Sequence, residues 1–121
     1  MKSAAILQWI IRVTGLIQLI LGIIVWTGIT DFLIICHILV GSILVIALWV
    51  LAYQALRAGV SKWLVILAAA WGLILPIWGL AQDKLLPETG HWIIQVLHLL
   101  CGVGAVGMAE ILASKMHKKN A

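Results

Sequence analysis

The sequence carries very little charge. Only 10% of its 121 residues are charged, whereas 64% are hydrophobic, and the mean hydropathy is +1.20. A soluble domain of this size has too small an interior to hide that much apolar surface from water. The scarcity of charge therefore excludes a soluble globular protein, and we expect a lipid bilayer around the chain.

Cysteine is also scarce, and the motif for covalent haem attachment is missing. Cys36 and Cys101 lie inside long apolar runs, where we interpret them as small packing residues. No C-x-x-C-H sequence is present, which excludes a c-type cytochrome. The first apolar run carries Arg12 and has no small-residue cleavage site after it. We therefore interpret that run as a retained membrane helix rather than a signal peptide.

Four apolar runs are long enough to cross a bilayer, which takes about 20 helical residues. They lie near Ala5–Trp26, Asp31–Ala55, Lys62–Ala81 and Gly90–Ser114. The short turns between them favour an up-down-up-down arrangement, in which the second and fourth helices face each other across the centre. We predict an all-α fold, a transmembrane four-helix bundle, with residues 1–121 as a single membrane domain.

The basic residues are placed unevenly along the chain. By these spans, seven of the eight Lys and Arg residues lie towards the chain ends or beside the middle turn, and only Lys84 lies in another turn. This positive-inside pattern predicts a multi-pass protein of the cell (inner) membrane with both termini in the cytoplasm. The net charge of +4 then reflects topology, and we expect no nucleic-acid partner.

The chain contains two copies of one helical hairpin. GLIQLILG at Gly15–Gly22 in the first run resembles GLILPIWG at Gly72–Gly79 in the third. HILVG at His37–Gly41 in the second run resembles HLLCG at His98–Gly102 in the fourth. Each copy is a glycine helix followed by a histidine helix. We predict that the two hairpins are related by an axis along the membrane normal.

The repeat predicts that two histidines meet inside the bundle. His37 lies six residues and His98 eight residues after the start of its run (37 − 31 and 98 − 90). These separations correspond to about 9 and 12 Å from the outer surface at 1.5 Å per residue. Both imidazoles should therefore lie at one level in the outer half of the bilayer, with Gly41 and Gly102 one turn below them.

Two facing imidazoles suit one haem iron. Neutral imidazole is a good axial ligand, and two of them on opposite sides saturate the iron. Zinc usually takes three or four protein ligands, and no carboxylate or thiolate set converges with these histidines. Glycine gives a flat macrocycle room beside a helix. The sequence therefore predicts one non-covalent haem b per chain. Its iron ligands are His37 and His98, and the glycines beside it are Gly22, Gly41, Gly79 and Gly102.

This pattern resembles the haem-binding four-helix core of the cytochrome b of quinol-oxidising bc complexes. In that family the second and fourth helices supply the ligand histidines, at positions matched here by His37 and His98. The first and third helices supply glycines that pack on the haems, matched by Gly15, Gly22, Gly72 and Gly79. The family has a second histidine pair about two heptads deeper, where this chain has Leu51 and Leu112. The resemblance thus implies a cytochrome reduced to a single haem layer.

We expect a b-type cytochrome that transfers electrons or senses redox state. The haem propionates should point to the outer water, because burying an unpaired carboxylate in lipid is very costly. Lys84 and His91 could pair with them there, and a membrane quinone or an external redox protein could exchange electrons. The sequence leaves enzymatic turnover and homo-oligomer formation open. The alternative is a non-haem membrane protein, either a scaffold subunit of a larger complex or a small carrier.

Two charged residues lie within the predicted spans. Arg12 should lie about 10 Å inside the membrane, where an unpaired arginine is costly. Glu110 lies at a comparable depth in the fourth run, and we predict that the two side chains pair. The alternative is that Arg12 extends to the cytoplasmic surface.

Overall fold

The computed structural model describes residues 2–28, 31–85 and 88–121. Within these residues the chain forms four α-helices, namely α1 (Lys2–Trp26), α2 (Asp31–Arg57), α3 (Lys62–Ala81) and α4 (His91–Asn120). Two short 3-10 helices, η1 (Gln82–Lys84) and η2 (Glu88–Gly90), lie between α3 and α4. All four α-helices are long and apolar enough to cross a membrane.

The helix bounds follow the predicted spans closely. They differ by three residues or fewer, except at the C-terminal end of α4, which continues six residues past Ser114 (120 − 114). The basic segment after Ser114 is therefore helical and belongs to α4. With its last two turns, α4 is 30 residues long, or about 45 Å. That length exceeds the hydrocarbon core of a bilayer by about 15 Å.

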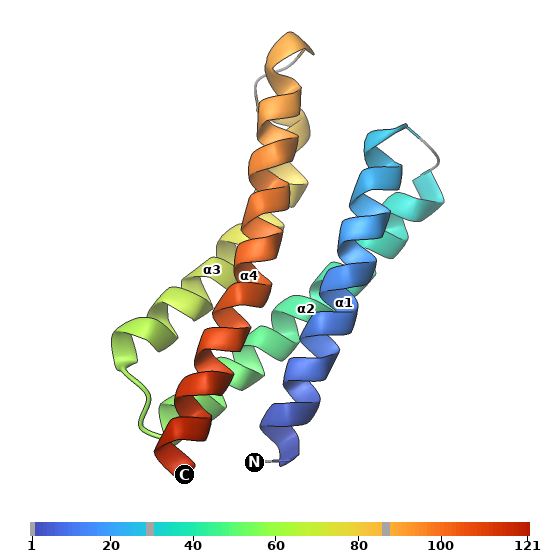
Figure 1. Ribbon diagram of the computed structural model, residues 1–121. Helices are drawn as coiled ribbons and strands as arrows, with labels where there is room; N and C mark the ends of the chain where they lie inside the picture. Colours follow the sequence, from blue (N-terminus) through green and yellow to red (C-terminus); the bar gives the residue numbers. More distant parts are fainter. Residues whose placement is uncertain (1, 29–30, 86–87) are drawn as a thin grey trace.

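The four helices form an up-down-up-down bundle of two hairpins, α1–α2 and α3–α4 (Figure 1). Both termini and the α2–α3 turn lie at one end of the bundle, which we name the terminal end (Figure 1). The two hairpin turns lie at the opposite end, which we name the hairpin end (Figure 1). Helices α2 and α4 contact each other, whereas α1 and α3 do not contact within the described residues. This confirms that the two histidine helices face each other across the centre.

The α2–α3 turn is fixed by a glycine in the left-handed region. Gly59 has a φ of 79°, which costs a residue without a Cβ little. Its N–H donates to the carbonyl of Leu56 at 3.1 Å, and the N–H of Val60 donates to the carbonyl of Ala55 at 3.0 Å. These two bonds form a Schellman motif. Val60 and Ala55 are both buried, so the turn ends α2 and returns the chain directly to the core.

Burial divides the bundle into two halves. The terminal half comprises the described residues of 2–15, 44–72 and 105–121, and the hairpin half those of 16–43 and 73–104. Ile94 is the one buried hydrophobic side chain among the described residues of the hairpin half. The terminal half holds all the other buried hydrophobic residues, including the largest fully buried ones: Ile11, Leu48, Leu51, Leu112 and Met116.

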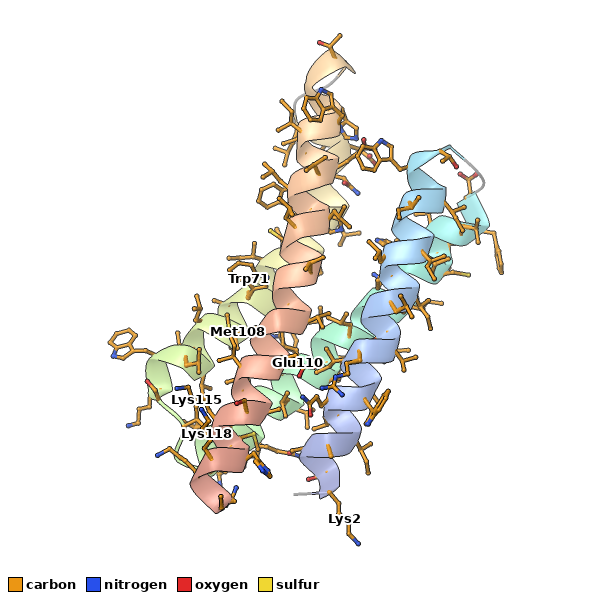
Figure 2. The ribbon with its side chains drawn as sticks, viewed as in Figure 1. Lys2, Trp71, Met108, Glu110, Lys115 and Lys118 are labelled. Atoms are coloured by element: carbon orange, nitrogen blue, oxygen red, sulfur yellow. The ribbon has the colours of Figure 1, made fainter. Side chains whose placement is uncertain are left out.

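The outward surface of the bundle is apolar over all four helices. Large hydrophobic side chains are well exposed, for example Leu16 at 60%, Leu39 at 59%, Leu73 at 52% and Leu100 at 58%. Lysines instead gather at the terminal end, where Figure 2 labels Lys2, Lys115 and Lys118. An apolar belt with a charged end is the surface of a bundle that lies in lipid.

Candidate functional site

Two histidine rings face each other in the hairpin half. His37 projects from α2 and His98 from α4, and both side chains are half-buried. Their ring centroids lie 6.3 Å apart, and the ring planes are tilted by 59°. The two imidazoles therefore lie at one level on opposed helices, as the spacing within the repeat predicts.

A glycine of the neighbouring helix lies against each ring. A Cβ added to Gly22 on α1 would stand 3.4 Å from Cε1 of His37, and one added to Gly79 on α3 would stand 2.9 Å from Cε1 of His98. Glycine thus lets each ring approach the other helix of its own hairpin. The same contact occurs in both hairpins, which supports the repeat seen in the sequence.

The glycines one turn below the histidines differ from each other. A Cβ on Gly41 would stand 2.6 Å from Nε2 of Gln18, so the Gln18 amide fills the space over this glycine. At Gly102 no described heavy atom outside its own helix lies within 4 Å of that point. The sequence predicted room at both positions, but only Gly102 has it. The reason is that the residue aligned with Gln18 in the second hairpin is Leu75, which packs against the core.

The hairpin half also contains buried polar atoms without hydrogen-bond partners. Within the described residues there are four, one on each helix: Gln18 Oε1, His37 Nδ1, Trp78 Nε1 and His98 Nδ1. A buried donor or acceptor left unpaired costs about 1–3 kcal/mol. All four belong to the hairpin half, so the unmet hydrogen-bonding capacity of the described residues is concentrated there.

The residues in this layer fit an iron porphyrin better than a bare metal ion. No group of three or more His, Cys, Asp or Glu side chains in the described part of the chain could hold a metal ion. A porphyrin supplies four nitrogens itself and needs only two imidazoles. An imidazole–metal bond is about 2 Å long, and the ring centroid lies roughly 1 Å further out, so centroids across one metal are about 6 Å apart. The observed separation of 6.3 Å is of this size, while the Cε1–Nε2 edge of the His98 ring is turned towards Gly79.

The two residues expected beside the propionates lie nearer the hairpin end. Lys84 is exposed in η1. His91 begins α4, and its Nδ1 lies 3.4 Å from the carbonyl oxygen of Leu85. Both are therefore separated from the histidine layer along the helix axis, and His91 also has a partner within the loop.

A second polar cluster links α1 to α4 in the terminal half. Arg12 donates from Nε to Oε1 of Glu110 at 2.6 Å and from a terminal nitrogen to Oε2 at 3.0 Å. Gln8 donates from Nε2 to Oε2 of the same carboxylate at 2.5 Å. The Arg12 guanidinium also lies 5.4 Å from the centroid of the Trp9 ring. The predicted pairing of Arg12 with Glu110 is confirmed, and Gln8 completes the cluster; Figure 2 labels Glu110 at the inner face of α4.

Sequence reasoning did not single out Gln18 or Trp78 as residues of the histidine layer. The octapeptides Gly15–Gly22 and Gly72–Gly79 differ at both positions. Gln18 aligns with Leu75, and Trp78 aligns with Leu21. A polar or hydrogen-bonding residue in one copy, opposite leucine in the other, is the signal that could have found them.

Comparison with known proteins found no relative of this chain. No protein-family model, curated protein or solved structure matches this chain. The resemblance to the cytochrome b core therefore stays a prediction based on the residues themselves.

Proposed function

We propose that this chain is a small integral-membrane b-type cytochrome that binds one haem b between His37 and His98. The observation that carries the proposal is the pair of facing imidazoles with centroids 6.3 Å apart. Three further features support it: the glycines against both rings, the free space at Gly102, and the unpaired polar atoms of the same layer.

The two histidines would hold the haem iron from α2 and α4, and with both imidazoles engaged the chain would leave no place for a further ligand. Bound haem would supply one-electron redox chemistry. Gly22 and Gly79 leave room for the two rings to lie between the helices, and the surrounding apolar residues exclude water. The site therefore suits electron transfer or redox sensing rather than the activation of a small molecule.

A single haem would confine electron exchange to one side of the bundle. Fourteen residues further along α2 and α4 (51 − 37 and 112 − 98) stand Leu51 and Leu112, which are both 0% exposed. The terminal half thus has a packed apolar core at the level where a second haem would be needed. With cytoplasmic termini, electrons would be exchanged at the outer, hairpin end, near Lys84 and His91, with a quinone or an external protein.

The absorption spectrum tests haem binding. Protein purified after expression with sufficient haem should have a Soret band and sharp α and β bands when reduced. His37→Ala and His98→Ala should each lose or strongly alter these bands. His91→Ala is the matched control and should keep the wild-type spectrum. A wild-type protein without a Soret band, or ligand variants with unchanged spectra, would overturn the proposal and favour the non-haem scaffold or carrier.

Sealed vesicles test the direction of electron exchange. With the termini inside, an impermeant reductant added outside should reduce the haem, whereas the same reductant trapped inside should leave it oxidised. The orientation can be measured separately, because a cysteine introduced at Lys118 should resist an impermeant thiol reagent added outside. Fast reduction from within tight vesicles would contradict the outer placement of the haem.

A further inference from the structure

Two tryptophans in the middle of the bundle have their indole N–H groups satisfied by backbone carbonyls. Trp49 on α2 donates to the carbonyl of Ala69 on α3 at 3.1 Å. Trp71 on α3 donates to the carbonyl of Cys101 on α4 at 2.9 Å, and Figure 2 labels Trp71 on the side of α3 next to α4. Each ring lies over a glycine of the helix that accepts the bond. These indoles are structural links between helices.

Trp78 differs from both. Its Nε1 is buried and has no acceptor within the described residues. An indole N–H can only donate, so this group requires a hydrogen-bond acceptor that the described residues do not supply. Trp78 adjoins Gly79, which lies against the His98 ring. It also stands three residues before the end of α3 (81 − 78), about 4.5 Å along the axis, and one residue before Gly79, so its Cα lies at about the level of the His98 ring.

We infer that the Trp78 N–H donates a hydrogen bond to a propionate carboxylate of the haem held by His37 and His98. This inference rests on the proposed function. The propionates are the only hydrogen-bond acceptors at the edge of haem b, and they are the groups expected to point towards the hairpin end. A carboxylate is the strongest kind of acceptor for a neutral donor. Trp78 thus binds a haem carboxylate, and it lies deeper in the bundle than Lys84 and His91.

A comparison of two porphyrins and two tryptophans tests the inference. The haem-free protein is titrated with haem b and with its dimethyl ester, which lacks the carboxylate charge. A hydrogen bond to a charged group is worth about a tenfold change in affinity. Trp78→Phe, which keeps an aromatic ring but removes the donor, should weaken haem b binding about tenfold. The same substitution should barely change ester binding.

Trp71→Phe is the matched control. Its N–H is already bonded to Cys101, so any loss on substitution should affect haem b and the ester equally. Nuclear magnetic resonance gives a readout independent of affinity. The indole N–H signal of Trp78, in ¹⁵N-labelled protein, should move downfield when ferrous haem b is added, and less with the ester.

The outcomes separate this inference from the proposed function. Equal weakening of haem b and ester by Trp78→Phe, or an indole signal that does not move on haem binding, would overturn the role of Trp78 and leave the cytochrome intact. A wild-type protein that binds neither porphyrin would overturn both proposals.

Discussion

The two halves of this bundle use the same pair of helices in opposite ways. In the terminal half, α2 contributes Leu51 and α4 contributes Leu112 to the apolar core, and both are 0% exposed. Two heptads away in the hairpin half, the same helices meet through His37 and His98, whose Nδ1 atoms have no partner within the described residues. One half is a closed apolar core, and the other is a layer with unmet hydrogen-bonding capacity.

Polarity by itself does not distinguish the halves. The terminal half also holds polar side chains, but these are paired: Glu110 accepts bonds from Arg12 and Gln8, and the Thr14 hydroxyl donates to the carbonyl of Ile10 at 2.7 Å. In the hairpin half, Gln18 and Trp78 have buried atoms without a partner. The halves therefore differ in whether the chain satisfies its own polar groups. A ligand gains the most binding free energy where buried groups still lack hydrogen-bond partners.

Close packing in the terminal half offsets the cost of the unpaired polar atoms in the hairpin half. Lipid tails are as apolar as leucine, so close packing stabilises membrane helices more than burial does. Small residues permit that packing in the terminal half, where Ala55, Ala68, Ala105 and Ala109 are all 0% exposed. We infer that these contacts hold the bundle together while the hairpin half keeps its imidazoles unpaired.

Converting the histidine layer into a copy of the leucine layer should have the largest effect. The double variant His37→Leu with His98→Leu should lose haem binding completely. The haem-free bundle should become more stable, by about 1–3 kcal/mol, because the unpaired imidazole nitrogens are removed. A haem titration and unfolding in dodecyl sulfate would measure the two effects. A loss of haem-free stability would contradict our view that the histidines are kept for binding.

Filling the space at Gly102 should affect haem binding next most strongly. Gly102→Val places methyl groups where no described atom outside its helix lies within 4 Å of the Cβ position. The haem-free fold should tolerate this, but haem affinity should fall about 10- to 100-fold through overpacking. Gly107→Val is the control, because Gly107 also has no neighbour within 4 Å but is exposed in the terminal half. Equal haem affinities in both variants would mean that the haem does not use this space.

Truncating the leucine layer should affect stability but not the histidine site. Leu112→Ala should destabilise the bundle by about 2 kcal/mol, because a cavity remains where the side chain packed. Leu39→Ala, at a position that is 59% exposed, should cost less than about 0.5 kcal/mol. Unfolding in dodecyl sulfate gives both values. Similar losses in the two variants would show that the terminal half is not the stabilising half.

Breaking the charged pair of the terminal half should have the smallest effect of the four. Arg12→Leu leaves the Glu110 carboxylate without its strongest donor, so stability should fall. Adding Glu110→Leu should recover most of the loss, because the double variant has no unpaired charge. Gln8 still donates to the Glu110 carboxylate after the substitution, which keeps the single loss below that of Leu112→Ala. Additive losses in the unfolding assay would mean that the two side chains act independently.

Several features of this protein follow from the sequence alone. Apolar runs and the placement of charges predicted the four helices, and residue counting predicted that His37 and His98 share one level and that Arg12 pairs with Glu110. These predictions succeed because a helix rises a fixed 1.5 Å per residue, so depth along the bundle can be read from residue numbers. The observed ring separation of 6.3 Å and the Arg12–Glu110 ion pair agree with that counting.

The tertiary structure decided what each side chain touches at a given depth. The sequence treats Gly41 and Gly102 alike, yet the Gln18 amide covers Gly41 and leaves Gly102 free. Likewise, the sequence does not distinguish Trp49, Trp71 and Trp78, and only packing shows that the indole N–H groups of Trp49 and Trp71 are bonded while that of Trp78 is not. Lateral contacts depend on the rotation and crossing angle of every helix, which are set by how all four helices pack together.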